Sequence, residues 1–173
     1  MKTLRHLCVV LGITAACTLR ADVAPAAPRT DVIFDHPEKY ADIRDRDVPT
    51  EKGKAEILKN ISDHLVQQTA SAIPEGYKLT ITFTDVRLAG DFEPWHGPQC
   101  DEIRIIKDIY PPEFKFTYLV TDPSGNVVRK GSEDIRDINF LTRPLSDPRD
   151  SLGYEKDILD EWAHSSLRKL KKA

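Results

Sequence analysis

Two stretches of the chain alternate between apolar and polar residues with a period of two, which is the pattern of half-buried β-strands. In residues 79–83, leucine, isoleucine and phenylalanine alternate with threonine, and in residues 114–120 every other side chain is apolar. A shorter run with the same period covers residues 102–105, and Ile106 then breaks the phase. The turn sequence DPSGN at residues 122–126 predicts a hairpin, with a return strand that begins at Val127.

Two other segments carry apolar residues at helical spacing. In residues 51–73 they recur three or four positions apart, and Thr50 stands where an N-cap is expected. A second stripe runs through residues 154–170 and includes Trp162, which we expect in the core because it lies in the middle of the stripe. Residues 30–34 form a short strand candidate ahead of the first helix.

This order of elements favours an α+β fold. We expect an antiparallel sheet of about four strands with two main helices packed on one face, in the order β-α-β-β-β-α. The strand at residues 30–34 and the one at residue 79 flank a helix, so they can lie parallel. The length of 173 residues fits one domain, which we place at residues 30–173.

Residues 1–21 have the layout of a secretory signal peptide, with a basic start, an apolar run and then small residues. The apolar run is shorter than the ~20 residues that a membrane-spanning helix needs. Cleavage after residue 21 would leave residues 22–29 as a flexible tether. Lipid attachment at Cys17 is a second interpretation, because the sequence TAAC before and at this residue partly resembles a bacterial lipobox. We therefore expect secretion across the inner membrane, a periplasmic location with or without a lipid anchor, and no transmembrane helix in the mature chain.

The net charge narrows the classes of partner, and the cysteine content bears on disulfide formation. The chain has 25 Lys and Arg against 28 Asp and Glu, and loss of residues 1–21 removes three basic residues and no acidic one, which gives a mature net charge of about −6. A negative net charge argues against nucleic acid or an anionic membrane surface as the partner. After cleavage Cys100 would be the last cysteine, so no internal disulfide could form.

Five sequence blocks, taken together and in this order, resemble a bacterial family known as domain of unknown function 3016. They are DHPEKYADI from Asp35, FTDVRLAGD from Phe83, EIRIIKDIYPP from Glu102, DINF from Asp137 and YEKDILDEW from Tyr154. The resemblance covers roughly residues 30–170. It implies a secreted or envelope-associated bacterial protein, and it supplies no activity and no catalytic residue.

The best candidate for a site is the polar segment of residues 85–101. Asp85 shares the phase of the apolar residues before it, so it would face the core unless the strand ends or bulges there. In the core it would need a basic partner, for which Arg87, Arg104 and Lys107 are available. The residues that we predict for binding have polar or aromatic side chains in this segment: Asp85, Asp91, Glu93, Trp95, His96 and Asp101.

The chemistry of this segment has more than one interpretation. Carboxylates suit Ca²⁺ or Mg²⁺ and a histidine with carboxylates suits Zn²⁺, but the spacing matches no established metal motif. A loop of turns with solvated charges has the same composition. Trp95 either stands exposed as a recognition residue or folds back over the sheet edge. The chain lacks a nucleophile elbow, a glycine-rich phosphate loop and a C-x-x-C motif, so hydrolase, nucleotide-binding and thioredoxin-like functions have no signature here.

We therefore expect a non-catalytic binding or accessory protein of the periplasm or cell envelope, with no cofactor. Its partner would be a protein or another envelope component that contacts residues 90–101. A metal-assisted hydrolase that uses Asp85, Asp91, His96 and Asp101 is one alternative. A purely structural envelope protein is the other.

Overall fold

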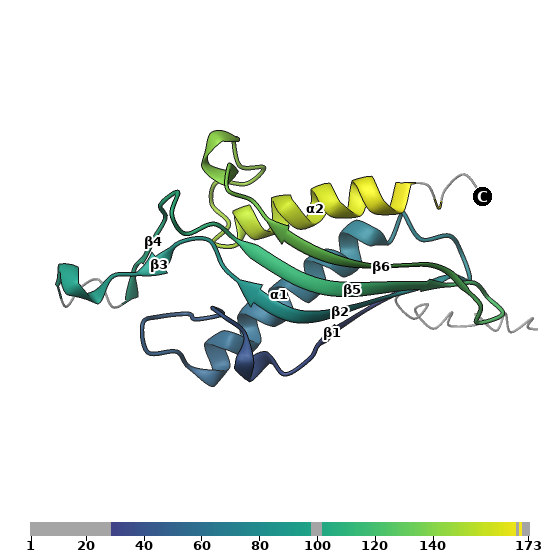
Figure 1. Cartoon of the computed structure of the whole chain (residues 1–173), viewed down its shortest axis with the longest axis horizontal. Coiled ribbons are helices and arrows are strands. Elements are labelled where there is room, and N and C mark those ends of the chain that lie inside the picture. Colours follow the sequence, from purple (N-terminus) through teal and green to yellow (C-terminus); the bar gives the residue numbers. More distant parts are fainter. Residues whose placement is uncertain (1–28, 98–101, 169, 171–173) are drawn as a thin grey trace, which may run out of the picture.

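The computed structural model describes residues 29–97, 102–168 and 170 (Figure 1). Four strands form the main sheet in the order β1-β2-β5-β6. They are β1 (Thr30–Phe34), β2 (Lys78–Arg87), β5 (Glu113–Thr121) and β6 (Val127–Arg136). The two helices, α1 (Glu51–Thr69) and α2 (Gly153–Leu167), lie on the same face of this sheet. The predicted α+β class and element order are confirmed. The predicted signal peptide, the tether up to residue 28, Cys17, Cys100 and Asp101 lie outside the described residues.

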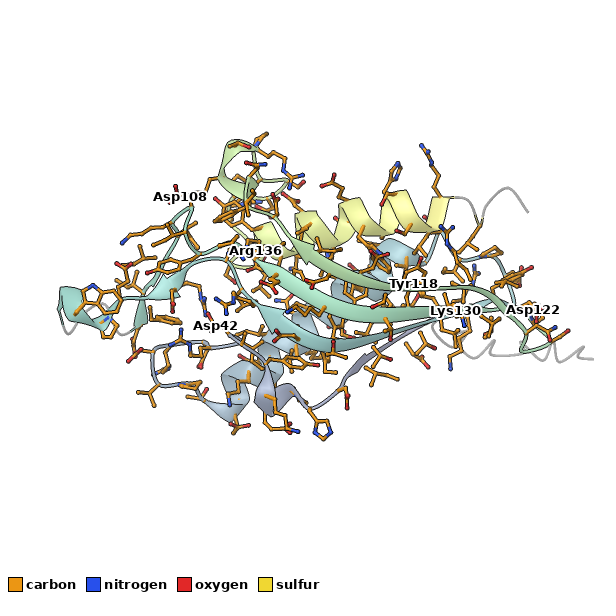
Figure 2. All side chains as sticks on the ribbon, viewed as in Figure 1. Asp42, Asp108, Tyr118, Asp122, Lys130 and Arg136 are labelled. Carbon is orange, nitrogen blue, oxygen red and sulfur yellow. The ribbon has the colours of Figure 1, made fainter. Side chains whose placement is uncertain are left out.

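The strand pairing follows the expected connections. The crossover through α1 places β1 parallel to β2, and β5 pairs antiparallel with both β2 and β6. The β5–β6 turn is the predicted one: the Asp122 carboxylate accepts the N–H groups of Ser124 and Asn126, and Gly125 has a φ of +83°. Asp122 lies at the far end of the molecule from Asp42 (Figure 2).

Helix α1 begins where the N-cap residue predicts. The Thr50 side chain accepts the N–H of Gly53 at 2.9 Å, and Asp45 in turn accepts the N–H and hydroxyl of Thr50. Such a cap satisfies N–H groups that have no partner within the helix. The helix ends at Thr69, four residues before the predicted end, and the chain then turns toward β2.

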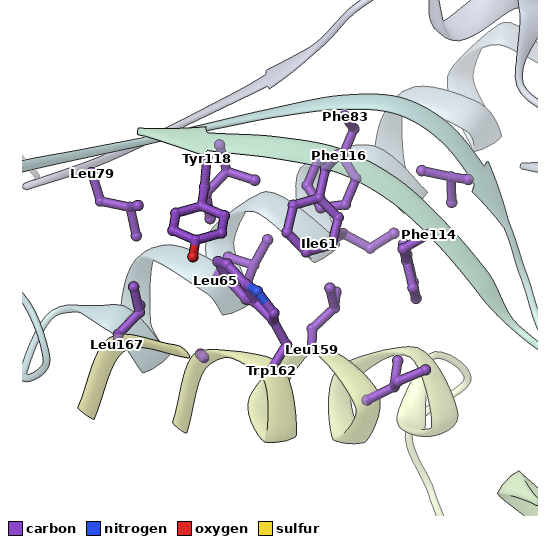
Figure 3. Packing of buried hydrophobic residues seen from close by; sticks show 14 of the residues in the cluster. Ile61, Leu65, Leu79, Phe83, Phe114, Phe116, Tyr118, Leu159, Trp162 and Leu167 are labelled. Atoms are coloured by element: carbon purple, nitrogen blue, oxygen red, sulfur yellow. The ribbon is translucent and has the colours of Figure 1, made fainter. Parts of the chain in front are cut away.

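The core lies between the sheet and the two helices (Figure 3). Trp162 of α2 packs edge-on against Phe116 and Tyr118 of β5, with ring centroids 4.8 and 5.4 Å apart. Ile61 and Leu65 of α1 complete this layer from the other helix. The expectation that Trp162 is a core residue is therefore confirmed. After β6, Phe140 is buried in the turn η4 (Phe140–Thr142), while the neighbouring Ile138 and Leu141 are exposed.

A β-bulge in β2 changes which side chains face the core. The register with β5 shifts between Phe83 and Asp85, so Thr84 is the extra residue. As a result Val86, opposite Phe114, is fully buried, and Asp85 is only half-buried. The sequence required a strand end or a bulge to keep Asp85 out of the core, and the bulge does this.

The third alternating run does not join the main sheet. Its residues form β4 (Arg104–Ile105), which pairs with β3 (Asp91–Phe92) in a separate two-stranded ladder. These strands and the short helix η2 (Pro94–His96) extend away from the end of the sheet (Figure 1). We call residues 91–97 and 102–110 the arm. At its base the N–H of Gly90 binds the carbonyl of Tyr110 at 2.9 Å. Within the described part of the chain, no helix combines the length and the apolar character needed to cross a bilayer.

Candidate functional site

A buried aspartate and two arginines fasten the arm to the body of the protein. Asp42 follows the short helix η1 (Pro37–Lys39), and its backbone binds Val86 and Leu88 at the end of β2. Arg104 on β4 donates to both oxygens of the Asp42 carboxylate, at 2.8 and 3.2 Å. The Nε of Arg44 donates to the same carboxylate at 2.9 Å. One carboxylate therefore holds two guanidinium groups, one of which belongs to the arm.

The surroundings of Asp42 favour its charged form. Burial alone would raise the pKa of Asp42, but the hydrogen bonds from Arg104 and Arg44 outweigh it and hold the pKa below its ordinary value. Both guanidinium groups also lie over the buried ring of Phe92, at 4.7 Å for Arg104 and 5.4 Å for Arg44. Cation–π contacts of this kind fix the orientation of the ring and the guanidinium planes together.

Two of the predicted binding carboxylates have structural contacts within the arm. Asp91 forms an ion pair with Arg44 and also accepts the N–H of Phe92. Glu93 is only 2% exposed, and it accepts two hydrogen bonds from Lys107, both at 2.7 Å, and one from the hydroxyl of Tyr110. These bonds raise the pKa of Lys107 and of Tyr110. Glu93 therefore joins the outgoing and returning halves of the arm.

Asp85 lies in the main sheet, outside the arm. Its Oδ1 accepts the N–H of Ala41 at 2.8 Å, in place of the basic partner that the sequence led us to expect. Two of the basic residues that we considered are bound to other acids, Arg104 to Asp42 and Lys107 to Glu93. Asp85 thus ties the segment after η1 to β2.

Trp95 is the predicted site residue that the structure leaves most open to solvent. Its side chain is 70% exposed, within η2 on the arm. Three isoleucines of the returning half are exposed as well: Ile103, Ile106 and Ile109. Of the two interpretations of Trp95, the exposed residue is therefore the observed one. His96 follows in η2, but its side chain and Asp101 are outside the described part.

The carboxylates do not meet at a metal centre. Within residues 29–97, 102–168 and 170, no group of three or more His, Cys, Asp or Glu side chains is arranged to hold a metal ion. In the metal-assisted alternative Asp85 and Asp91 would act together, whereas here they bind Ala41 and Arg44 respectively.

A cavity of about 370 Å³ lies at the base of the arm, and the sequence did not reveal it. Its apolar lining comes from α1, from the segment around β3 and from the start of α2: Ile57, Leu88, Phe92 and Leu152. Its innermost polar residue is Glu155, which is 2% exposed in the first turn of α2. Oε1 of Glu155 accepts the N–H of Ala89 at 2.6 Å. Among the described residues, Oε2 has no hydrogen-bond partner.

Helical spacing alone could have identified Glu155. It lies three, four and seven positions before Ile158, Leu159 and Trp162, which form the buried stripe of α2. The apolar stripe predicted for residues 154–170 starts with Tyr154, but this side chain is only half-buried. The buried side chain of the first turn is that of Glu155. Burial raises the pKa of Glu155 to about 7, despite the hydrogen bond from Ala89 that favours the charged form.

These observations define a class of protein: a small α+β domain with a projecting arm and a cavity beside the arm's base. A family model described as "Protein of unknown function (DUF3016)" matches residues 28–165, and the chain belongs to this family. The resemblance seen in the five sequence blocks is thereby confirmed. No curated protein and no solved structure matches the chain.

Proposed function

We propose that this protein is an exported, non-catalytic binding protein of the bacterial periplasm or cell envelope, and that it recognises a protein partner through the arm. The observation that carries the proposal is the 70% exposure of Trp95 on a segment that projects from the sheet (Figure 1). Tryptophan is among the residues that most often dominate binding energy at protein interfaces.

The arm also carries other large apolar side chains that are exposed. Ile103, Ile106 and Ile109 add to the surface of Trp95, and all four belong to one short segment of the chain. Scattered single apolar residues on a surface need no explanation, but a group of large ones is typical of an interaction site.

Internal contacts hold the arm in one conformation, which lowers the entropy cost of binding. The bond between Gly90 and Tyr110 closes its base, and the buried Glu93 joins its two halves. Arg104 fixes β4 to Asp42. The polar residues that a catalytic loop would use thus stabilise the arm, while Trp95 and the three isoleucines are exposed.

Site-specific photo-crosslinking in the bacterium that makes the protein tests this proposal. A photoreactive amino acid replaces Trp95 or Ile103, and the matched control replaces Val127, which is 53% exposed at the start of β6, directly after the turn at Asp122. We expect one discrete cross-linked species from each arm position and none from Val127. Cross-linking that is absent from the arm, or equal at Val127, would refute recognition by the arm and would favour a structural role.

The cellular location has a separate test. Intact-mass measurement of the protein from a membrane-free periplasmic extract should show a chain that begins after residue 21. A diacylglycerol-modified chain that begins at Cys17 and partitions into the membrane fraction would establish the lipid-anchored form. An uncleaved chain in the cytoplasm would refute export.

A further inference from the structure

We propose that the cavity at the base of the arm is a binding site for a small aliphatic amine, whose ammonium group pairs with Oε2 of Glu155 and whose hydrocarbon contacts Ile57, Leu88 and Phe92. This site is distinct from the exposed surface of the arm and does not depend on the function proposed above. Its volume of about 370 Å³ falls in the range of small-ligand pockets, roughly 300–1,000 Å³.

The first step of the argument is the hydrogen-bonding state of Glu155. A buried carboxyl group normally has all its oxygen atoms engaged, because an unpaired buried acceptor costs about 1–3 kcal/mol. Oε1 binds Ala89, whereas Oε2 has no partner among the described residues although Glu155 lines the cavity. A donor group inside the cavity would supply the missing bond.

The second step is the charge of the cavity, which decides between a cation and an anion. Both arginines of the lining are already paired with acids: Arg104 with Asp42, and Arg44 with Asp42, Asp47 and Asp91. The acids of the lining outnumber them: Asp45, Glu56, Glu102 and Glu155. Asp45 and Glu102 pair with Arg46, and Glu56 pairs with Lys52, which leaves Glu155 as the acid of the lining with an oxygen atom, Oε2, that has no partner among the described residues. Once ionised, this carboxylate favours a cationic ligand.

The third step concerns the helix N-termini, which commonly bind anions. Both α1 and α2 begin at this cavity, but at each start several N–H groups are already bonded within the chain and an acidic side chain, Asp45 or Asp150, lies beside them. Thr50 and Asp45 cap α1. Asp150 accepts the N–H of Leu152 through its side chain and that of Gly153 through its carbonyl. The helix ends therefore offer little to an anion.

The shape of the lining completes the description of the ligand. The buried carboxyl of Glu155 and the aliphatic and aromatic side chains form the interior, while Glu56 and Glu102 are exposed residues of the rim. A primary amine on a chain of a few carbon atoms matches this arrangement, with the ammonium group inside and the hydrocarbon against the apolar side chains. Exclusion of water by the hydrocarbon would strengthen the ion pair.

Binding of a cation would ionise Glu155, so the affinity should depend on pH. Among the described residues, the charged groups that face the Glu155 carboxyl come from four segments: Arg44 and Asp45 after η1, Glu56 of α1, Glu102 and Arg104 of the arm, and Asp150 before α2. Hydrogen bonds from Thr50 lower the pKa of Asp45; burial would raise the pKa of Asp150, but hydrogen bonds from Lys156 and Leu152 outweigh it and lower it. Glu155 is thus the group whose titration should control the affinity near neutral pH.

Three probes of equal length and different charge test the proposal on the purified protein: n-pentylamine, 1-pentanol and pentanoate. Binding is followed by NMR shifts of the Ala89 and Phe92 amides at pH 6 and pH 8. We expect saturable binding of pentylamine, at least tenfold weaker binding of pentanol, and no binding of pentanoate. The affinity for pentylamine should rise severalfold from pH 6 to pH 8.

Two variants test whether pentylamine binds at Glu155. Glu155→Gln keeps the size of the side chain and should weaken pentylamine binding at least tenfold. Glu161→Gln makes the same change at an exposed position of α2 and should leave binding unchanged. Equal binding of pentylamine and pentanol by the unmodified protein, preferred binding of pentanoate, or no binding of any probe, which would indicate a water-filled cavity, would each overturn the proposal.

Discussion

Arg104 and Asp42 are 62 positions apart in the sequence, and two hydrogen bonds of 2.8 and 3.2 Å join them. Asp42 is bound through its backbone to the end of β2, and Arg104 is the first residue of β4. The contact therefore sets the position of the arm relative to the sheet. Arg104 also donates to the carbonyls of Gly90 and Arg44, so its side chain joins β4 both to the segment that contains Asp42 and Arg44 and to the residue before β3.

Removal of the Arg104 side chain should destabilise the protein. Arg104→Met leaves the hydrocarbon but removes one partner of a largely buried ion pair, a change that costs about 3–5 kcal/mol when the pair is fully buried. Because both side chains retain slight exposure, we expect a loss of about 2–4 kcal/mol in the free energy of unfolding, measured by urea denaturation. Arg46→Met removes the exposed pair with Glu102 and should cost less than about 1 kcal/mol. Similar losses in the two variants would contradict a special role for Arg104.

The same cluster predicts a dependence of stability on acid. The pKa of Asp42 is lowered in the folded protein, so its contribution is fully present above the ordinary value of 3.8 and is lost as the pH falls through the lowered value. The difference in unfolding free energy between the unmodified protein and Asp42→Asn should therefore stay constant from pH 7 to about pH 4 and shrink below it. Chemical denaturation at several pH values measures this, and a difference that grows on acidification would contradict the assignment.

The raised pKa of Glu155 predicts that the free energy of unfolding changes with pH in the direction opposite to the Asp42 contribution. The pKa of Glu155 is about 7 in the folded protein against an ordinary 4.5, so the folded state holds a proton that the unfolded state releases between these values. Stability should therefore decrease as the pH rises from about 4.5 to about 7 and level off above. Glu155→Gln removes this titration and should exceed the unmodified protein by on the order of 1–3 kcal/mol at pH 8, with the advantage fading toward pH 4.5. Parallel pH profiles for the two proteins would refute the raised pKa.

The local periodicity of the sequence was enough to predict the main sheet and both helices. Alternation in residues 79–83 and 114–120 depends on which face of a strand meets the core, and the Thr50 cap and the turn at Asp122 depend on nearest neighbours in the chain. The parallel pairing of β1 with β2 followed from the long crossover. Each of these features is encoded within a few residues or by connection length.

The arm and the cavity could not be predicted from local periodicity or connection length, because they depend on contacts between residues far apart in the sequence. Strands β3 and β4 have two residues each, and the alternation around β4 does not show that it pairs with β3 outside the main sheet. The polar segment of residues 85–101 stands out in the sequence, but Glu93 reads as a candidate ligand until its bonds to Lys107 and Tyr110 are seen. Glu155 was overlooked although its spacing from Ile158 places it on the buried face.

The close approach of Gly131 to Tyr118 gives a prediction about the core. These residues lie opposite each other in β6 and β5, and a Cβ on residue 131 would stand 2.5 Å from the Tyr118 ring. Gly131→Ala should therefore cost about 1–3 kcal/mol, because the Tyr118 ring, which packs against Trp162, must shift. In a Tyr118→Leu background the same substitution should cost less than about 0.5 kcal/mol. A double-mutant cycle by urea denaturation measures the coupling, and additive effects would show that the ring does not impose the glycine.

Metal ions provide the test that separates a binding arm from a metal-assisted hydrolase. Because Asp91 forms an ion pair with Arg44, we expect Asp91→Asn to lower the melting temperature by a few degrees, equally with and without Ca²⁺, Mg²⁺ or Zn²⁺. Asp108→Asn, on the connection between β4 and β5, is the matched control and should have little effect.

A metal site would behave differently: one ion would raise the melting temperature of the unmodified protein, and both Asp91→Asn and His96→Ala would abolish that rise. That result, measured by thermal unfolding of protein first treated with a chelator, would replace the binding function with the metal-dependent one. A metal-independent loss in Asp91→Asn alone would instead assign the carboxylate to the base of the arm.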